Sequence, residues 1–594
     1  MDDLKLNVAQ RLVNMAAKIP NNIAIAEPIN KRGKAVRNPY GKRTYRVITF
    51  KELDQDSNRI AFALRHQGLV PGMKLAIMVR QGIDFITLVF ALYKAGAVLV
   101  LIDPGMGISK MLKCLRQIDL DGFVAISEVQ AVRTLMSHWF PHAKINLTVG
   151  KRWFWRGLSL SQIRKQPFGE AVLTETRADD PAAIIFTSGS TGPAKGVLYT
   201  HRIFDTQVEE ISRRYKIEPG EIDLAGFPFF GLFNAAMGTT AIIPDMDSTR
   251  PASVDPELFL EAVEDWKVTQ SFGSPALWNR VVGYCCEKHR KMTTLKRAII
   301  AGAPVPFSLL ERFKECIAAD GDIHTPYGAT ESLPVASNCA SIILAETAQK
   351  TRSGSGICVG KRFDSIEWLI LPITDSPISH LEDVQPLLPG EIGELAVTGP
   401  QVTKQYVTRL EANALAKMID SSGRIWHRIG DVGYLDHLDR FWFCGRKAHR
   451  VETRQGTLFS IPCESIANEH SDVFRSALVG IPETLPKQSS QSNDDIVRQQ
   501  DDSTPDSFSL NGQSESRSFL KPVIIVEPFA DRFPKTKSDQ NILTQNVLRL
   551  LQNSAITSSI ENVLICPKFP VDVRHNAKIN REKLAVWAAK QFSK

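Results

Sequence analysis

Residues 182–196 read AAIIFTSGSTGPAKG and are the most informative segment of the chain for its fold. Its apolar start predicts a buried strand, and the hydroxyl- and glycine-rich run that follows predicts a loop. Glycine lets backbone N–H groups turn towards phosphate oxygens, while hydroxyls and a lysine supply further donors. The sequence therefore predicts an anion-binding loop, whose candidate residues are Thr187, Ser188, Gly189, Ser190, Thr191, Gly192 and Lys195.

Two other interpretations compete with an anion-binding loop. A Walker A loop requires the pattern G-x-x-x-x-G-K-[ST], but Ala194 precedes Lys195 and Gly196 follows it, so that pattern fails. A solvated Ser/Gly turn remains as the plain alternative. The position of the loop directly after an apolar strand favours a phosphate site over a simple turn.

Composition limits the class of protein. With 594 residues, 43% apolar and 23% charged, the chain is long enough for several folded units. The net charge of +8 is spread without a dense basic run, which is compatible with nucleotides and does not indicate nucleic acid. Nine scattered cysteines without a C-x-x-C pair favour a reducing compartment over disulfides or zinc. The start Met1-Asp2-Asp3 lacks the basic residues of a signal peptide, so we expect a cytoplasmic protein.

The order of apolar segments predicts layered α/β structure. Residues 75–78 and 98–101 are typical of strands, and residues 85–95 of a helix between them, which favours parallel pairing. The apolar run 85–102 therefore predicts a buried helix followed by a buried strand, with no transmembrane segment. Helical spacing of apolar residues from Leu4 to Ala16 predicts an amphipathic helix docked on the protein, with a membrane surface as the alternative.

A polar stretch near the end of the chain points to a small second domain. Residues 486–518 are rich in Ser, Gln, Asp and Asn and contain Phe508 as their single aromatic residue. Such a segment cannot bury enough apolar surface to order itself, which predicts a disordered insertion. Apolar runs at residues 477–481 and 523–526 flank it and predict two strands of one domain.

The loop at 182–196 resembles the phosphate-binding loop of the acyl-adenylate-forming superfamily, and five further motifs follow it in the family order. They are found at residues 301–304, 327–331, 430–434, 443–447 and 574–581. The resemblance implies an α/β fold, with layered βαβ subdomains and a β-barrel-like region in a large domain over residues 1–445. It also implies a small, mobile α+β domain over residues 446–594, and the use of ATP and Mg²⁺.

The resemblance also implies a role for each motif residue. Gly302, Ala303 and Pro304 would form the turn beside the adenine. Tyr327 would lie against the adenine, with Gly328 and Ala329 continuing its turn. Thr330 would contact phosphate, and Glu331 would be a catalytic residue that holds Mg²⁺, a role that suits a hard carboxylate. Asp431 would accept hydrogen bonds from the ribose hydroxyls, and Arg446 would contact the nucleotide.

Lys578 and Thr187 complete the implied catalytic set. In the resemblance, Lys578 reaches the substrate carboxylate and the α-phosphate, where an ammonium stabilises developing negative charge. Two departures from the family pattern stand nearby. Ala448 occupies the hinge position where Asp or Lys is common, and Ala577 replaces the usual glycine before Lys578. The first departure bears on the hinge and leaves the nucleotide motifs intact.

Segments 102–107, 243–252 and 574–587 look like those of the β-lactone synthetases of olefin biosynthesis. That similarity implies activation of a long-chain 2-alkyl-3-hydroxy fatty acid as an acyl-AMP, followed by attack of its own hydroxyl to give a β-lactone, AMP and pyrophosphate. It also implies assembly with a β-lactone decarboxylase and other olefin-pathway enzymes. Two alternatives stay open, which are a long-chain acyl-CoA or acyl-carrier ligase on the same scaffold and a non-catalytic acyl or nucleotide sensor.

The acyl pocket and the base are less defined by sequence. The aromatic segment 227–233 resembles the border of the family's acyl pocket, and it is equally compatible with plain core. His201, His324 and His575 are available as bases for ring closure. A packed or hydrogen-bonded structural role is the expectation for each of them.

Overall fold

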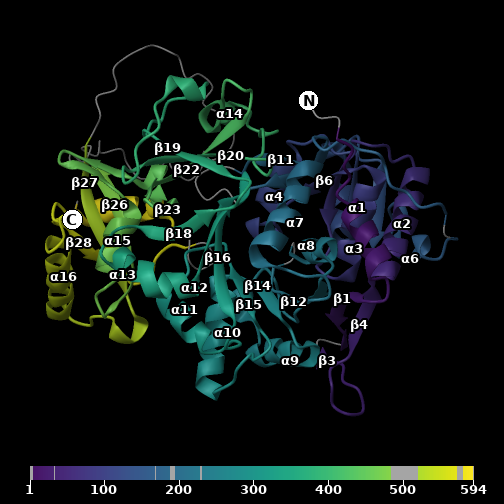
Figure 1. Cartoon of the computed structure of the whole chain (residues 1–594), viewed down its shortest axis with the longest axis horizontal. Helices are drawn as coiled ribbons and strands as arrows, with labels where there is room; N and C mark the ends of the chain where they lie inside the picture. The colour runs from purple at the N-terminus through teal and green to yellow at the C-terminus, as the bar shows by residue number, and fades with distance from the viewer. Residues whose placement is uncertain are drawn as a thin grey trace, which may run out of the picture. The chain divides into compact units, whose positions relative to one another are not determined.

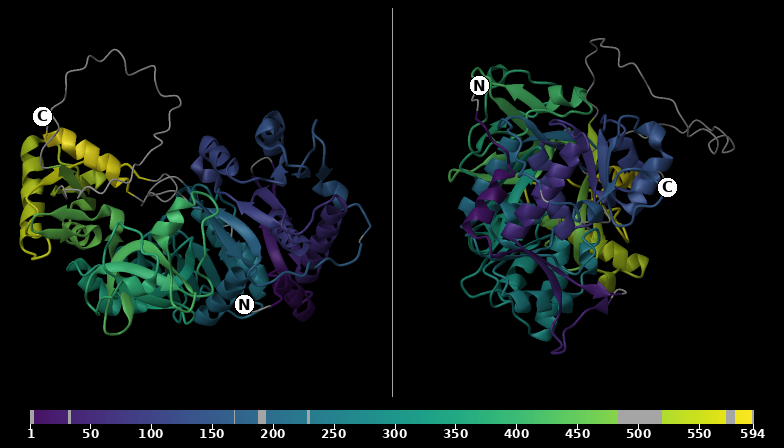
Figure 2. Two further views of the ribbon diagram at one scale, coloured as in Figure 1. Left: turned by 90° about the horizontal axis from the view of Figure 1, so that it is seen from above. Right: turned by 90° about the vertical axis from the view of Figure 1, so that its right-hand side faces the viewer.

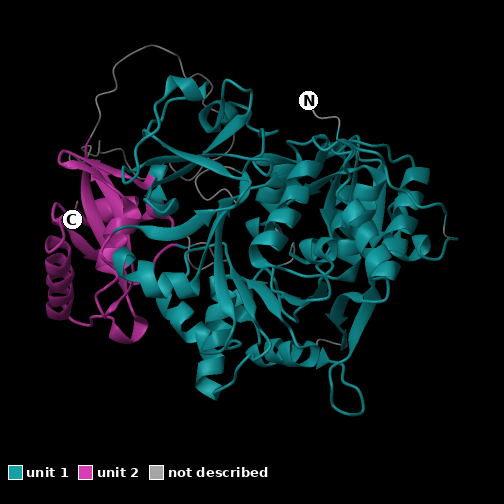
Figure 3. Ribbon diagram, in the orientation of Figure 1, with its two compact units in different colours: residues 1–351, 355–448, 571–578 teal, residues 352–354, 449–570, 579–594 magenta. Residues whose placement is uncertain are grey.

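The computed structural model describes residues 4–31, 34–167, 169–187, 194–227, 230–482, 519–571 and 579–592. The chain divides into two compact units (Figure 3). Unit 1 comprises residues 1–351, 355–448 and 571–578, and unit 2 comprises residues 352–354, 449–570 and 579–594. The main division thus follows Ala448, whereas the sequence placed the domain boundary after residue 445. The expected insertion at 486–518 lies outside the described residues.

Unit 1 contains a sheet with seven described strands in the order β11-β10-β6-β5-β7-β8-β9. Their bounds are β5 Lys74–Met78, β6 Val98–Leu101, β7 Gly122–Ile126, β8 Ile145–Val149, β9 Leu158–Ser159, β10 Pro181–Phe186 and β11 Gly196–Thr200. All neighbours pair in parallel except β10 and β11. The strands predicted at 75–78 and 98–101 and their parallel pairing are therefore confirmed.

The helix predicted between these strands is α3 (Ile83–Ala95), and it is buried along almost its whole length. Its one lysine, Lys94, is fully buried and extends towards α2 (Phe50–His66). There Lys94 Nζ lies 2.6 Å from Asp54 Oδ1 and donates to Ser57 Oγ at 2.8 Å. Pairing with a carboxylate is what allows a charge inside such a helix. No helix in the described ranges is long and apolar enough to cross a membrane.

The N-terminal helix is shorter than predicted. It is α1 (Gln10–Lys18), and its Leu12 is completely buried in the core, which confirms that it docks on the protein. The residues before it are not helical, because Leu6 N–H donates to the carbonyl of Thr176 at 2.9 Å. Asn7 Nδ2 also donates to the carbonyl of Tyr93 at 2.9 Å. These long-range bonds hold the start of the chain in an extended form that local spacing does not reveal.

A second sheet of unit 1 has fourteen described strands, and its main path runs β19-β20-β22-β23-β18-β17-β16-β15-β14-β12-β13-β1-β4, with β21 paired to β22. The strands of its first half are β1 Ile23–Pro28, β4 Tyr45–Thr49, β12 Ile222–Ala225, β13 Thr240–Ile242, β14 Gln270–Gly273, β15 Arg297–Ile300 and β16 Asp322–Ala329. Strands β12 to β16 and β1 pair in parallel. The helices between them are α7 His201–Tyr215, α8 Phe230–Met237, α9 Pro256–Trp266, α10 Pro275–Lys288 and α11 Phe307–Lys314 (Figure 1).

The other half of this sheet is antiparallel. Its strands are β17 Ser332–Cys339, β18 Ile357–Arg362, β19 Glu367–Leu371, β20 Gly393–Thr398, β21 Lys417–Ile419, β22 Ile425–Leu435 and β23 Arg440–Arg446. The N-terminal part of the unit, coloured purple to blue, lies together in both views of Figure 2. The mixed α/β class is confirmed.

Unit 2 is built on a three-stranded sheet of β26 (Val473–Pro482), β27 (Leu520–Pro528) and β28 (Val563–Ile565). The first two strands are antiparallel and contain the runs predicted at 477–481 and 523–526, so that prediction is confirmed. Its helices are α15 Ser460–Ala467, α16 Lys537–Gln552 and α17 Arg581–Phe592. Glu464 of α15 is buried and accepts three hydrogen bonds from Arg581 of α17, the shortest at 2.7 Å.

Buried His201 provides a test of this fold through pH. Val8 N–H donates to its Nδ1 at 3.2 Å, and burial lowers the pKa of His201 to about 4. Between pH 6.5 and 4 the unfolded chain binds a proton that the folded chain does not, so the free energy of unfolding falls as the pH is lowered. We expect the titration of His201 to lower the free energy of unfolding by about 2 kcal/mol between pH 7 and pH 5.

The variant H201Q keeps an acceptor for Val8 but does not titrate. Its unfolding free energy, measured by denaturant titration with tryptophan fluorescence at both pH values, should depend less on pH than that of the wild type. The exposed His437 is the matched control, and H437Q should behave as the wild type. Equal pH dependence of H201Q and wild type would contradict this account.

Candidate active site

One cavity of about 1190 Å³ lies entirely within unit 1. It opens at the carboxyl ends of parallel strands from both sheets, which is where α/β proteins place their ligands. Strands β6 and β10 reach it with the residues around Ile102 and Thr187, and β12, β14 and β15 with those around Phe227, Ser274 and Ala301. The lining includes all candidate site residues that the structure describes: Thr187, Lys195, Gly302, Ala303, Pro304, Tyr327, Gly328, Ala329, Thr330, Glu331, Asp431 and Arg446.

The two described ends of the candidate anion loop close on each other. Thr187 N–H donates to the carbonyl of Lys195 at 3.0 Å, and Lys195 N–H donates to Thr187 Oγ1 at 3.1 Å. These bonds extend the antiparallel pairing of β10 and β11 to the mouth of the loop. Ser188, Gly189, Ser190, Thr191 and Gly192 lie outside the described residues, as does Lys578.

Three of the candidate residues meet around one buried carboxylate, that of Asp431 on β22. Tyr327 from β16 donates its hydroxyl to Asp431 Oδ2 at 2.5 Å, and Arg446 Nε from β23 lies 3.0 Å from Oδ1. Burial raises the pKa of Asp431, while the Arg446 guanidinium acts in the opposite direction. Burial and the neighbouring carboxylate both raise the pKa of Tyr327 well above its usual value, so its hydroxyl keeps the proton that it donates.

A second group surrounds Glu331. Tyr406 donates its hydroxyl to Glu331 Oε1 at 2.7 Å, and the Nζ of Lys195 lies 4.7 Å from the centroid of the Tyr406 ring. The neighbouring Thr330 is held through its carbonyl, which accepts from Tyr199 at 2.6 Å. Tyr406 thus links the candidate metal ligand to the lysine of the anion loop, although the sequence analysis did not select it.

Two further residues beside this group escaped the sequence analysis. The Nζ of Lys417 on β21 lies 5.7 Å from the centroid of the Tyr406 ring and donates to the carbonyl of Thr403. Burial lowers the pKa of Lys417 to about 7. His427 of β22 lines the cavity, with its Nδ1 3.0 Å from the carbonyl of Ala416, and burial keeps its pKa well below the usual value. Neither residue belongs to a motif: His427 lies just before the 430–434 motif on β22, and Lys417 is paired with it across the β21–β22 hairpin.

The wall away from these charges is apolar. Phe227, Phe230, Leu232 and Phe233 line it, and the ring of Phe230 stacks on that of Phe272 with centroids 4.7 Å apart. The expectation that segment 227–233 borders a pocket is met by its described members, while Pro228 and Phe229 lie outside the described residues. One part of the cavity is thus charged and another is lined by phenylalanine.

The histidines weighed as bases do not line this cavity. His201 accepts from Val8 as described above, and the His324 ring packs at a tilt against that of Tyr215, with centroids 4.9 Å apart. Burial lowers the pKa of His324 to about 4, as it does for His201. The expected structural role is therefore confirmed for both, and His575 lies outside the described residues.

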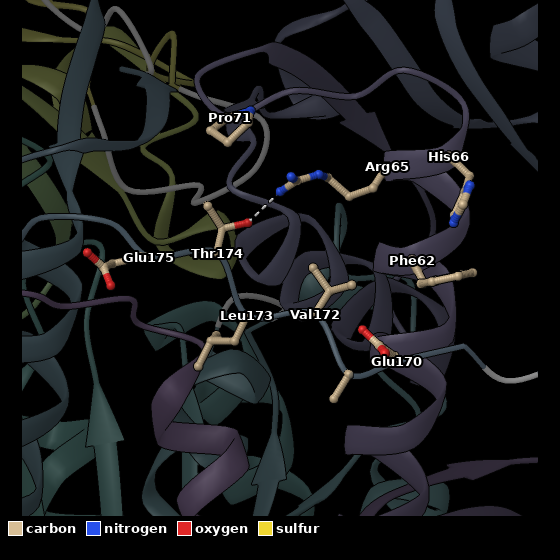
Figure 4. A pocket seen from close by; sticks show the side chains of 10 residues that line it. Phe62, Arg65, His66, Pro71, Glu170, Val172, Leu173, Thr174 and Glu175 are labelled. Carbon is tan, nitrogen blue, oxygen red and sulfur yellow. Dashed lines mark hydrogen bonds between the residues drawn. The ribbon is translucent and has the colours of Figure 1, made fainter.

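A second hollow, of about 600 Å³, is lined by α2 and the segment 170–175. Figure 4 shows Arg65 reaching across it, where Nη1 donates to Thr174 Oγ1 at 2.9 Å. None of the candidate site residues lines it. The large cavity is therefore the candidate active site.

Comparisons with known proteins agree with this geometry. Residues 20–407 match the family described as AMP-binding enzymes, and the chain belongs to that family. It is 39% identical to an olefin β-lactone synthetase of Xanthomonas campestris over 98% of both chains, and 38% identical to one of Stenotrophomonas maltophilia over 99% of both. Among solved structures it is similar to O-succinylbenzoate coenzyme A synthetase from Bacillus subtilis in complex with ATP and magnesium. That likeness has a TM-score of 0.68 and 18% identity, and covers 96% of this chain and 99% of the other.

Asp431 offers a direct test of the site. The variant D431N keeps the size of the side chain but removes the charge that pairs with Arg446. We expect the dissociation constant for AMP to rise by about 10- to 100-fold, the effect of losing a hydrogen bond to a charged group. Isothermal titration calorimetry measures it. The control D439N changes an exposed carboxylate on the turn that follows β22 and should leave AMP binding unchanged. Equal affinities of D431N and wild type would contradict the assignment.

Proposed function

We propose that this enzyme uses ATP to activate a long-chain 2-alkyl-3-hydroxy fatty acid as an acyl-AMP and then closes it to a β-lactone, releasing AMP and pyrophosphate. The observation that carries the proposal is the 39% identity to an olefin β-lactone synthetase over 98% of both chains. The cavity supports it with the two surfaces that such a substrate pair needs. Its polar lining suits a nucleotide, and its apolar wall suits an alkyl chain.

The residues of the polar lining fit ATP. Asp431 can accept from vicinal ribose hydroxyls, because a carboxylate has several acceptor sites and its position is held by Tyr327 and Arg446. The aromatic ring of Tyr327 and the small residues 302–304 suit the adenine. Thr187, Thr330 and Lys195 supply hydroxyls and a cation for the phosphates. We propose the same role for the loop residues 188–192.

Glu331 fits a magnesium ion. It is a hard oxygen donor that lines the cavity, and Tyr406 holds one of its two oxygens. When bound, Mg²⁺ offsets the negative charge of the phosphates. The Tyr406 hydroxyl orients the Glu331 carboxylate by its hydrogen bond. Residues that hold a metal ligand in this way usually matter to metal affinity almost as much as the ligand itself.

The proposed reaction has two steps. First the substrate carboxylate attacks the α-phosphorus of ATP, the bond to the β-phosphate breaks, and pyrophosphate leaves with the electron pair. The 3-hydroxyl oxygen then attacks the activated carbonyl carbon, its proton is lost, and AMP leaves. Attack by a tethered hydroxyl needs no second substrate, and the enzyme contributes mainly by holding the reacting atoms together. We propose that Lys578, with Lys195, neutralises charge that develops during the first step.

The β-lactone is the product that a β-lactone decarboxylase would consume. A strained cyclic ester is prone to hydrolysis in water, so direct delivery to the next enzyme has a chemical reason. We therefore propose assembly with such a decarboxylase and with other olefin-pathway enzymes. We further propose that residues 446–594 act as a mobile domain, in line with the division of the chain after Ala448.

An assay without coenzyme A distinguishes the candidate functions. With ATP, Mg²⁺ and a synthetic 2-alkyl-3-hydroxy fatty acid, we expect β-lactone, AMP and pyrophosphate in equal amounts, detected by mass spectrometry and a pyrophosphate assay. A 2-alkyl acid without the 3-hydroxyl is the matched control, and it should yield no lactone. A thioester formed only after coenzyme A is added would instead identify an acyl-CoA ligase. Absence of both products and of pyrophosphate would favour a sensor.

The variant K578A tests the proposed adenylation lysine. Because the ammonium acts on charge that develops during phosphoryl transfer, its loss should abolish pyrophosphate release while ATP binding stays largely intact. Pyrophosphate release and ATP titration measure the two effects. The control K583A removes a lysine of α17 that is exposed and should retain activity. Unchanged pyrophosphate release in K578A would refute the role.

A further inference from the structure

An unusual surface loop follows β8. Residues 151–156 read KRWFWR, three consecutive aromatic residues enclosed by basic ones. Trp153 and Phe154 are 55% and 65% exposed, although side chains of this size are normally covered in a folded protein. Trp155 is only 4% exposed. The loop therefore turns two aromatic side chains outward and one inward.

The fold holds this loop in place. The indole Nε1 of Trp155 donates to Thr148 Oγ1 at 2.8 Å, and Ser127 Oγ donates to the carbonyl of Lys151 at 2.6 Å. The loop closes at Gly157, which has a φ of 114° and where a Cβ would lie 2.4 Å from the carbonyl oxygen of Asn146. The rings of Trp153 and Phe154 lie against that of Trp155, with centroids 5.4 and 5.2 Å from it. The exposed pair is thus a supported feature of the surface.

The flanking charges are all positive. Lys151, Arg152 and Arg156 are exposed, and no ion pair within the described ranges joins any of them to a carboxylate. Arg152 donates instead to the carbonyl of Gly157 at 2.5 Å. The surface formed by residues 151–156, which we call the aromatic–basic loop, therefore combines exposed rings with cations that are available to an anionic partner.

The topology puts this loop on the same edge of the sheet as the active site. Strands β6, β5, β7 and β8 are parallel neighbours in that order, so their carboxyl ends share one edge. The cavity is lined at the carboxyl end of β6 by Leu101 and Ile102, and the loop follows the carboxyl end of β8. Three strand spacings separate β6 from β8, which amounts to roughly 15 Å.

We propose that the aromatic–basic loop docks unit 1 on an anionic lipid bilayer, with Trp153 and Phe154 in the headgroup region and Lys151, Arg152 and Arg156 beside lipid phosphates. Tryptophan and basic residues are the side chains that favour this interface. A stable protein partner would need a much larger contact than two aromatic residues supply. The choice of lipid also rests on the proposed function, because a long-chain acid partitions into bilayers and would enter the cavity from that side.

Vesicle binding tests the docking separately from catalysis, because it needs neither ATP nor substrate. The full chain is mixed with vesicles of phosphatidylcholine alone or with 30 mol% phosphatidylglycerol, and the bound fraction is measured by co-sedimentation. We expect binding to the anionic vesicles that is weakened by 0.5 M salt, and about tenfold weaker binding of W153S/F154S. The variant K151Q/R152Q/R156Q should lose the preference for anionic lipid.

The control L388S/L438S removes two exposed leucines at other places and should bind as the wild type. Trp155 stays in every variant, and activity on a short, water-soluble hydroxy acid should be unchanged, which separates loss of docking from misfolding. Failure of the wild type to bind anionic vesicles, or equal binding of W153S/F154S, would overturn the proposal. Binding of the loop to another protein of the pathway in the absence of lipid would overturn it as well and assign the loop to a protein interface.

Discussion

The geometry of the candidate active site depends on one buried carboxylate, that of Asp431, shared between a phenol and a guanidinium. A buried charge is tolerated only when it is paired and hydrogen-bonded, and here the partners come from two other strands of the same sheet. The register of the β22–β23 hairpin, which sets Asp431 opposite Arg446, therefore becomes part of the site. A slip of one residue would turn Asp431 to the other face of the sheet and leave Arg446 and Tyr327 without their shared partner.

Two further carboxylates of the cavity, those of Glu331 and Glu394, also have partners. The Nζ atoms of Lys195 and Lys417 lie 4.7 and 5.7 Å from the centroid of the Tyr406 ring, and the Tyr406 hydroxyl donates to Glu331. The cavity lining also contains buried Glu394, whose Oε2 forms ion pairs with Arg428 Nη2 at 2.6 Å and with Lys447 Nζ at 3.1 Å. Asp431, Glu331 and Glu394 thus each have a charged or hydrogen-bonding partner, and phenylalanines line another, apolar part of the cavity. An enzyme that joins a charged nucleotide to an alkyl acid requires this contrast.

Both sheets of unit 1 contribute to this arrangement for a common reason. Parallel strands have their carboxyl ends on one edge, and each βα connection then brings a loop to that edge. The candidate anion loop follows β10, the turn at 301–304 follows β15 and the aromatic–basic loop follows β8, whereas Tyr327 lies within β16 itself. Short connections are therefore enough to bring the residues that line the cavity and the aromatic–basic loop to the carboxyl ends of the parallel strands.

Elements with local signals could be predicted from the sequence. Apolar runs located β5, α3, β6, β26 and β27, and the ordered motifs identified the family and all candidate residues that line the cavity. The tertiary structure alone set the extended start before α1, because Leu6 and Asn7 bond to residues more than 80 positions away. It also decided the parts played by Tyr406, Lys417 and His427, which have no motif of their own. Backbone pairing places them, with Tyr406 opposite the distant Val197 and Lys417 opposite His427, and single-sequence periodicity does not show which strands become neighbours.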